Sequence, residues 1–149
     1  MLSRQASHAL KALLGLAARP LEWQSTHALA TAHQLPEPML EQLLLRLRRA
    51  GLLDGKRGRL GGYRLTRPAR DISMEQILAG LGETLKESAN RSATSEPASS
   101  PADQVTHALQ LRLERVRLKA LAELSLEDLL FDLRSAVAGS DSEGGLMLG

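Results

Sequence analysis

The sequence predicts a mainly α-helical protein that carries one two-stranded β-hairpin. Leucine and alanine dominate the 149 residues and only three residues are aromatic, a composition that favours helices over a β-sandwich. In most segments the apolar residues recur at helical spacing. One basic, glycine-rich stretch between two short apolar runs interrupts that pattern and indicates the hairpin. The length suits a single domain with an appendage.

The first helix is expected over residues 2–18, whose apolar residues fall on one stripe. Ser3 suits its N-cap, because a serine hydroxyl accepts a hydrogen bond from the unpaired N–H groups of the first turn. A second helix is expected to follow a short connector, from Ser25 or Thr26 to about His33.

The third helix is expected to begin near Glu37 or Pro38, because a proline fits the opening turn, where its missing N–H is not needed. It is expected to run to Ala50, and Gly51 suits the position just after a helix. Two short helices joined by a tight turn have the spacing of a helix-turn-helix. In that motif the second helix enters the DNA major groove with its N-terminal residues leading.

Two short strands are expected at residues 52–56 and 62–66, on either side of the basic stretch 57–61. Together they form a β-hairpin with a charged tip, called a wing. Gly61 and Gly62 are expected to supply a turn with positive φ, which glycine adopts without strain.

Ser73 marks the start of a fourth helix, because Gln76 stands three residues later and completes a capping box. Residues 1–85 are therefore expected to form a winged helix-turn-helix domain, with a three-helix core and a two-stranded wing. Residues 86–103 hold almost no large apolar group and are expected to be a flexible linker. Residues 139–149 are rich in glycine and serine and are expected to be a disordered tail.

Residues 104–138 are expected to form dimerisation helices. A long helix from about residue 102 to residue 124 carries an apolar row at nearly heptad spacing, and a final helix starts after Ser125. The row consists of Val105, Leu109, Leu113, Val116, Ala120 and Leu124. A second apolar side means that the long helix needs two partners. Those partners are its own domain and a second subunit, or both sides pack within one chain.

Charge is distributed unevenly along the chain. Residues 1–85 hold 12 Lys and Arg against 7 Asp and Glu, a net charge of +5, whereas residues 86–149 hold 7 against 10, a net charge of −3. A basic first part joined to an acidic second part suggests that only the first part meets a polyanion. The alternative is an ordinary solvated basic face.

Several function classes are excluded by the residues that the chain lacks. It has no cysteine, and its four histidines never stand at the i, i+4 spacing of a helical metal site. Nucleophile-elbow and phosphate-loop motifs are missing as well. We therefore expect no enzyme activity, no metal and no cofactor. With no apolar run of about 18 residues and no signal-peptide layout, we expect a cytoplasmic protein without a membrane partner.

The third helix carries the residues expected to read DNA bases. Its leading end shows Pro38, Met39, Glu41 and Gln42. Gln42 can pair bidentately with adenine, and Glu41 can accept from the cytosine amino group. Arg46, on the outer face of the same helix, is expected to touch phosphate.

The wing and the second helix carry the remaining candidate contacts. Lys56, Arg57 and Arg59 suit a narrow minor groove, where the negative potential is strongest. Gly61 and Gly62 are expected to allow close backbone approach. Two hydroxyl residues at the start of the second helix, Ser25 and Thr26, are expected to donate to phosphate.

Four stretches of the chain resemble one known family. They are PMLEQLLLRLRRAGLL at residues 38–53, RGRLGGYRL at residues 57–65, ISMEQI at residues 72–77 and LSLEDLL at residues 124–130. Together they are similar to the Rrf2 family of bacterial winged-helix transcriptional regulators, of the IscR, NsrR and CymR type. The resemblance spans about residues 2–135.

The resemblance implies a homodimer, held by crossed long helices, on a palindromic promoter site of double-stranded DNA. It further implies that Glu41 and Gln42 contact bases and that Arg57 enters the minor groove. Two departures from the family pattern bear on DNA recognition. Pro38 replaces a base-contacting serine, and Arg59 and Leu60 replace the wing proline.

A third departure concerns iron. Several relatives hold an iron–sulfur cluster through three cysteines in the segment matching residues 86–104, where this chain has none. His107 matches a fourth, histidine ligand of some relatives, but one imidazole cannot hold a cluster alone. We therefore expect no iron–sulfur cluster.

These patterns predict a sequence-specific DNA-binding regulator, a homodimeric repressor without a cluster. An effector, whether a small molecule or a protein, is left open. The alternative is a winged-helix protein-interaction module that has lost DNA binding and regulates or sequesters a partner protein.

Overall fold

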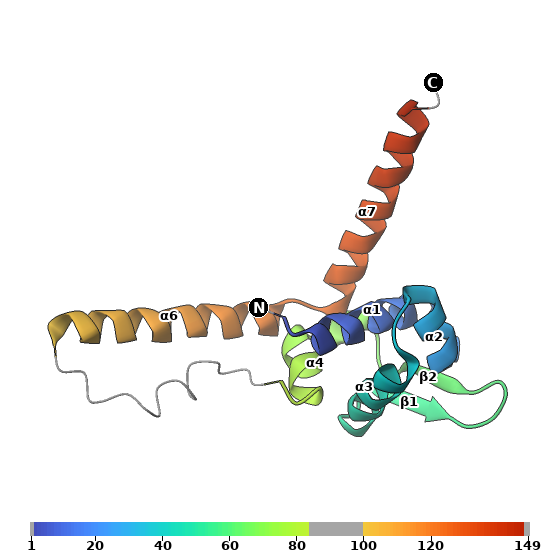
Figure 1. The fold of residues 1–149 in the computed structure, drawn as a ribbon, viewed down its shortest axis with the longest axis horizontal. Coiled ribbons are helices and arrows are strands. Elements are labelled where there is room, and N and C mark those ends of the chain that lie inside the picture. Colours follow the sequence, from blue (N-terminus) through green and yellow to red (C-terminus); the bar gives the residue numbers. More distant parts are fainter. Residues whose placement is uncertain (1, 84–99, 148–149) are drawn as a thin grey trace.

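The computed structural model describes residues 2–83 and 100–147, with side chains up to residue 141. The elements in chain order are α1 (Arg4–Ala18), α2 (Thr26–His33), α3 (Glu37–Arg49), β1 (Leu53–Lys56), β2 (Gly62–Leu65), η1 (Ala69–Asp71), α4 (Met74–Gly80), α6 (Pro101–Glu123) and α7 (Leu126–Met147). Figure 1 shows α1 to α4 and the hairpin gathered together, with α6 and α7 extending away as two arms. The predicted mainly helical fold with one two-stranded hairpin is confirmed.

Serine caps fix the starts of the short helices. The side chains of Ser3 and Ser25 accept hydrogen bonds from the first turns of α1 and α2. Ser73 and Gln76 form the expected capping box at α4. Each cap satisfies a backbone donor that the helix itself leaves unpaired, which explains why these boundaries follow the sequence signals so closely.

The turn between α2 and α3 is held by one residue in the left-handed region. Gln34 has φ 54°, and its N–H and that of Leu35 return to carbonyls of α2. Pro36 and Glu37 then open α3, with proline in its first turn. The two helices are therefore joined tightly, as the helix-turn-helix spacing predicts.

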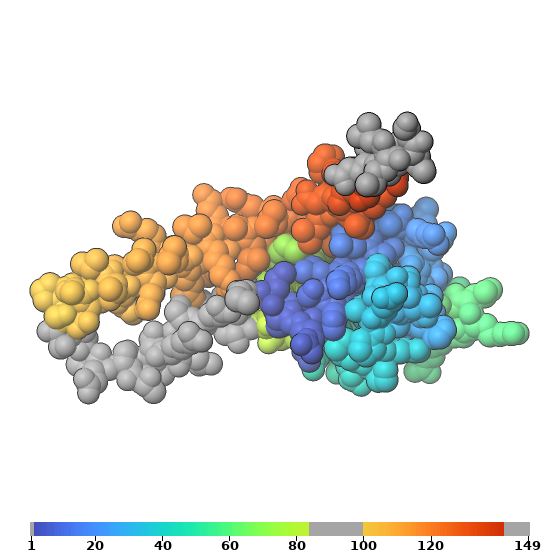
Figure 2. All heavy atoms as spheres, turned by 45° about the horizontal axis from the view of Figure 1, so that its top comes forward, coloured from blue at the N-terminus to red at the C-terminus, as the bar shows by residue number. Residues whose placement is uncertain are grey.

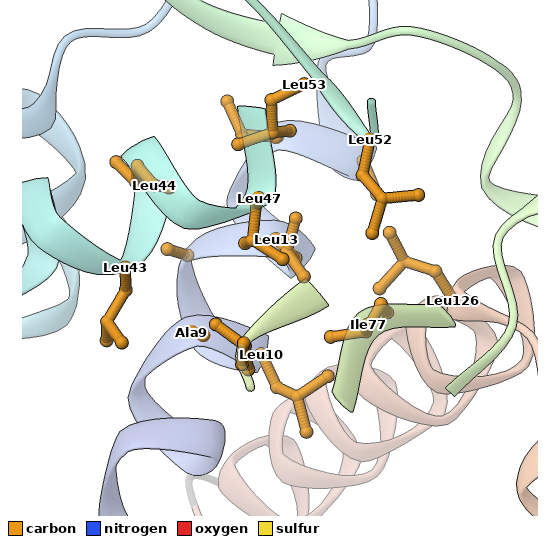
Figure 3. Close-up of a cluster of buried hydrophobic side chains, with 14 of the residues drawn as sticks. Ala9, Leu10, Leu13, Leu43, Leu44, Leu47, Leu52, Leu53, Ile77 and Leu126 are labelled. Carbon is orange, nitrogen blue, oxygen red and sulfur yellow. The ribbon is translucent and has the colours of Figure 1, made fainter. Parts of the chain in front are cut away.

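A leucine core joins the helices of the domain. Leu13 of α1, Leu44 and Leu47 of α3 and Ile77 of α4 are fully buried in one cluster, with Leu13 and Leu47 side by side at its centre (Figure 3). Leu126, the first residue of α7, is also fully buried in this cluster. The final helix thus belongs to the domain core at its first turn, although it lies far along the chain.

Backbone hydrogen bonds fix the start of α7 against the domain. Met74 N–H donates to the Leu124 carbonyl at 2.8 Å, and Leu126 N–H donates to the Ile72 carbonyl at 2.8 Å. The helix starts after Ser125, as the sequence predicts, and Asp128 completes the cap, with Ser125 N–H donating to the Asp128 carboxylate at 2.9 Å. The residues between α6 and α7 are thus bonded to the segment that leads into α4.

The predicted apolar row of α6 is exposed in the single chain. Val105, Leu113 and Val116 are each at least 60% exposed, and Leu109 and Leu124 are also exposed. On another side of the same helix, Leu121 packs against the domain core. One of the two apolar sides is thus partly used within the chain. No described helix is long and apolar enough to cross a membrane.

The prediction that the C-terminal tail is disordered differs from the structure. Residues 139–149 were expected to be disordered and α7 to end near Ala138, but α7 continues to Met147. A glycine costs about 1 kcal/mol in a helix, yet extending an established helix needs no new nucleus. The Ser140 hydroxyl also donates to the Ala136 carbonyl at 3.1 Å within the helix. Most of the predicted linker, residues 84–99, lies outside the described residues, and α6 already begins at Pro101, before the expected linker end at residue 103.

We expect Leu126→Ala to lower the free energy of unfolding by about 2–5 kcal/mol, because it removes a fully buried side chain from a close-packed cluster. Urea denaturation followed by circular dichroism measures this change. Leu133→Ala on the same helix is the matched control, since Leu133 is 40% exposed and its loss should cost far less. Equal losses for both variants would contradict the placement of Leu126 in the core.

Candidate nucleic-acid interface

The helix α3 divides into a buried leucine face and an exposed polar face. Leu40, Leu43, Leu44 and Leu47 are buried in the core. Pro38 and Gln42 near the start of α3 are exposed, and Met39 is half-buried against the core. The Gln42 amide is thus open to solvent, as base reading in a major groove requires.

Glu41 joins three elements of the domain through its carboxylate. One oxygen accepts from the Thr26 hydroxyl of α2, and the other accepts from the Tyr63 hydroxyl of β2 at 2.9 Å. Glu41 is half-buried and Thr26 is 8% exposed. The expected phosphate contact of the Thr26 hydroxyl does not fit this geometry, because that group is buried and donates inside the protein.

Burial and Glu41 together raise the pKa of Tyr63 to about 12. Burial is the larger cause, and the hydrogen bond and negative charge of Glu41 add to it, since both favour the neutral phenol. Tyr63 therefore remains a hydrogen-bond donor to Glu41 at any physiological pH. No local pattern in the sequence predicts this role of Tyr63, and only its place in the GGYRL stretch marks it.

The wing has a buried inner face and a charged tip. Leu53 pairs with Leu65 and Gly55 with Tyr63 in the antiparallel register, and the three large side chains of these pairs are buried. Arg57, Arg59 and Leu60 at the tip are exposed. Figure 2 shows this hairpin protruding at the end of the molecule opposite α6. Its tip is therefore free to enter a narrow groove.

Two wing glycines allow the chain to approach itself. Gly62 has φ +141°, and a Cβ there would lie 2.3 Å from the Gln24 carbonyl oxygen. Gly61 does not have the positive φ that was expected of it, and a Cβ there would meet the Lys56 carbonyl oxygen at 2.0 Å. Both contacts are internal, so these glycines serve the packing of the wing.

The connector before α2 forms an unexpected third edge of the wing. Gln24 pairs with Tyr63 as an isolated antiparallel bridge, with N–H to carbonyl distances of 3.0 and 2.8 Å. Beside it, the Trp23 ring lies 4.1 Å from the Arg64 guanidinium carbon and 5.8 Å from the Lys56 ammonium. The sequence predicts only a short connector here, and the one signal in it is the single tryptophan of the chain.

The remaining candidates occupy exposed positions around these elements. Ser25 is exposed at the start of α2, although its hydroxyl already accepts from the Ala28 N–H at 3.0 Å. Arg46 is exposed on α3, and its guanidinium makes a long contact of 3.5 Å to the Leu81 carbonyl. Both remain sterically open to a phosphate.

We expect Glu41→Gln to lower the pKa of Tyr63 from about 12 towards its ordinary value, because the substitution removes the negative charge that opposes tyrosinate. Ultraviolet titration measures this directly, since Tyr63 is the only tyrosine. Glu37→Gln is the control, because Glu37 faces His27 at 3.0 Å and lies outside this network. An unchanged titration in Glu41→Gln would show that the two side chains are apart in solution.

Sequence comparisons point to transcriptional regulators. Residues 2–132 match the Rrf2 family, described as iron-dependent transcriptional regulators. The chain is 38% identical over 135 residues to slr0846 of Synechocystis sp., a candidate HTH-type transcriptional regulator, and the match covers 90% of each chain. It is also 38% identical over 87 residues to the HTH-type transcriptional regulator IscR of Cereibacter sphaeroides, covering 56% of each chain.

Structure comparisons agree with the sequence matches. CymR (YrzC), the global cysteine regulator of B. subtilis, has a TM-score of 0.73 and 25% identity, covering 87% of this chain and 95% of that one. T. potens IscR has a TM-score of 0.67 and 30% identity, covering 91% of this chain and 90% of that one. The mainly helical, winged architecture is therefore shared along nearly the whole chain.

The donors of this chain do not fit an iron–sulfur cluster. The sequence has no cysteine and so supplies no thiolate, the usual ligand of such clusters. Among the residues that the structure describes, no three acidic or histidine side chains gather to hold a metal ion. His107, which the resemblance matches to a fourth ligand, is exposed on α6.

Proposed function

The chain belongs to the Rrf2 family of transcriptional regulators, which are not enzymes, and on this premise we propose that it binds specific DNA sequences. The observation that carries the proposal is the exposed leading end of α3, packed beside a hairpin with a cationic tip. Gln42 reads bases in the major groove, and Arg57 enters the adjoining minor groove. Glu41 aligns α3 against α2 and the wing, and its remaining lone pairs can accept from a base.

The proposed active form is a homodimer held by α6. The apolar row of α6 exposes several large side chains in succession, whereas exposed leucines on a protein surface are normally scattered. In the proposed dimer, a second copy of the same helix covers this row by knobs-into-holes packing. A two-fold dimer presents two α3 helices to a palindromic operator, with half-sites about 10 bp apart or a multiple of that.

The dimer is proposed to act as a repressor in the cytoplasm, by occupying promoter DNA. It does so without an iron–sulfur cluster, because the chain lacks the thiolates that would hold one. Any signal must then reach the protein through a different effector, a small molecule or a protein.

Arg57→Ala is expected to weaken DNA binding by about 1–3 kcal/mol and to lower the salt slope of binding by about one, because a groove-inserted cation is lost. The measurement is fluorescence anisotropy with a labelled duplex that the wild-type protein enriches from a random library, repeated at several salt concentrations.

Arg134→Ala provides the matched control, since Arg134 is an exposed arginine on α7 and carries the same charge. Its affinity should equal that of the wild type. Failure of the wild type to enrich any duplex, together with a stable complex with another protein, would replace this proposal by the protein-interaction alternative.

Leu113→Glu is expected to convert the dimer into a monomer, because it places a charge in the middle of the proposed α6 interface. Sedimentation velocity reports the oligomeric state, and circular dichroism checks that the domain remains folded. Val137→Glu changes an apolar side chain of similar exposure on α7 and should leave the dimer intact. A wild type that sediments as a monomer would contradict the interface.

A further inference from the structure

The outer face of the wing is covered by a side chain from outside the hairpin. In the strand register Asp54 lies opposite Arg64, and Lys56 lies two residues after Asp54. Residues directly opposite each other, and residues two apart, point to the same side of a two-stranded ribbon. The three charged residues therefore share the face away from the buried Tyr63.

Trp23 lies on that outer face. Its ring is 4.1 Å from the guanidinium carbon of Arg64 and 5.8 Å from the Lys56 ammonium, both within the range of cation–π attraction. Within the described part of the chain, Arg64 makes no ion pair with the opposing Asp54. The indole face thus holds the guanidinium in place of the carboxylate across the strand.

This contact leaves Arg64 and Lys56, the two cations at the root of the wing, able to bind an anion. A planar guanidinium that lies on a ring still presents the N–H donors of its edge, which fit two phosphate oxygens. Lys56 is exposed beside it, at the last residue of β1 before the tip. The phosphates that border a minor groove lie next to any tip inserted into that groove.

We infer that Trp23 is a positioning residue of the wing, which holds Arg64 and Lys56 in place as contacts to the DNA backbone. The inference rests on the proposed DNA binding and adds to it a residue outside both the recognition helix and the hairpin. Trp23 acts through the two cations and reads no base, so its loss weakens specific and non-specific binding alike.

The test compares Trp23→Ala, Trp23→Leu and Trp23→Phe with the wild type, on the library-enriched duplex and on a scrambled duplex. Trp23→Ala and Trp23→Leu should bind both duplexes roughly fivefold more weakly, because ordering the freed cationic side chains on binding then costs about 1 kcal/mol. Trp23→Phe keeps an aromatic face and should recover most of the affinity. Leu21→Ala, an exposed change in the same connector, is the control for the backbone.

A double variant separates positioning from general stability. Arg64→Met should lower the salt slope by about one. Adding Trp23→Ala to Arg64→Met should then cost less than Trp23→Ala does alone, because Trp23 acts through Arg64. Since Trp23 is the only tryptophan, its fluorescence should also change in Arg64→Met and when DNA is added to the wild type.

Wild-type affinity in Trp23→Ala, or equal recovery by leucine and phenylalanine, would overturn the inference while leaving the proposed function standing. Full additivity of the two substitutions would overturn it as well. A wild type that binds neither duplex would remove the proposed function itself. Thermal unfolding of each variant identifies any loss that comes from misfolding.

Discussion

The wing keeps its place because its second strand pairs with the connector before α2. Gln24 and Tyr63 exchange two backbone hydrogen bonds, and this pairing brings the chains so close that Gly62 has no room for a side chain. Two strands of four residues are marginally stable on their own. The bridge adds a third edge, and the Tyr63 side chain then reaches Glu41 of α3. The wing and the helix-turn-helix are thereby held as one body.

The two halves of the chain satisfy their apolar surface in different ways. The first half buries its leucines in a core shared by α1, α3 and α4, and uses Leu126 of α7 to complete that core. The long helix α6 contributes only a few contacts, such as Leu121, and leaves its heptad row in water. This exposed apolar row is the surface that the proposed second copy of α6 would cover. The separation of charge along the chain follows the same division, with the basic half exposing polar side chains on α3 and the wing.

Sequence patterns predicted the features that depend on neighbouring residues. Ser3, Ser25 and Ser73 cap helices through bonds to the next turn, and the wing strands follow from their spacing around the basic loop. Features that depend on distant residues were missed or misassigned. Thr26 looks like an ordinary exposed cap residue until α3 brings Glu41 to its hydroxyl. Trp23 looks like a spacer until β2 brings Arg64 beneath its ring. The extension of α7 was missed because glycine and serine content measures a weak local preference, which an existing helix overrides.

The distribution of rigidity in the wing follows from these contacts. At the tip, Gly58 has φ +106° and a Cβ there would meet no atom within 4 Å, and one hydrogen bond from the Gly61 N–H to the Gly58 carbonyl at 3.1 Å closes the turn. Arg59 and Leu60 stand where the resemblance expects a proline, which removes a further restraint on the loop. The packing that holds the wing in place therefore lies at its root, where Tyr63 packs on the inner face and Trp23 on the outer face. In the proposed DNA complex, a tip with few packing contacts on a fixed root would let the arginines adapt to the width of a groove while the hairpin keeps its direction.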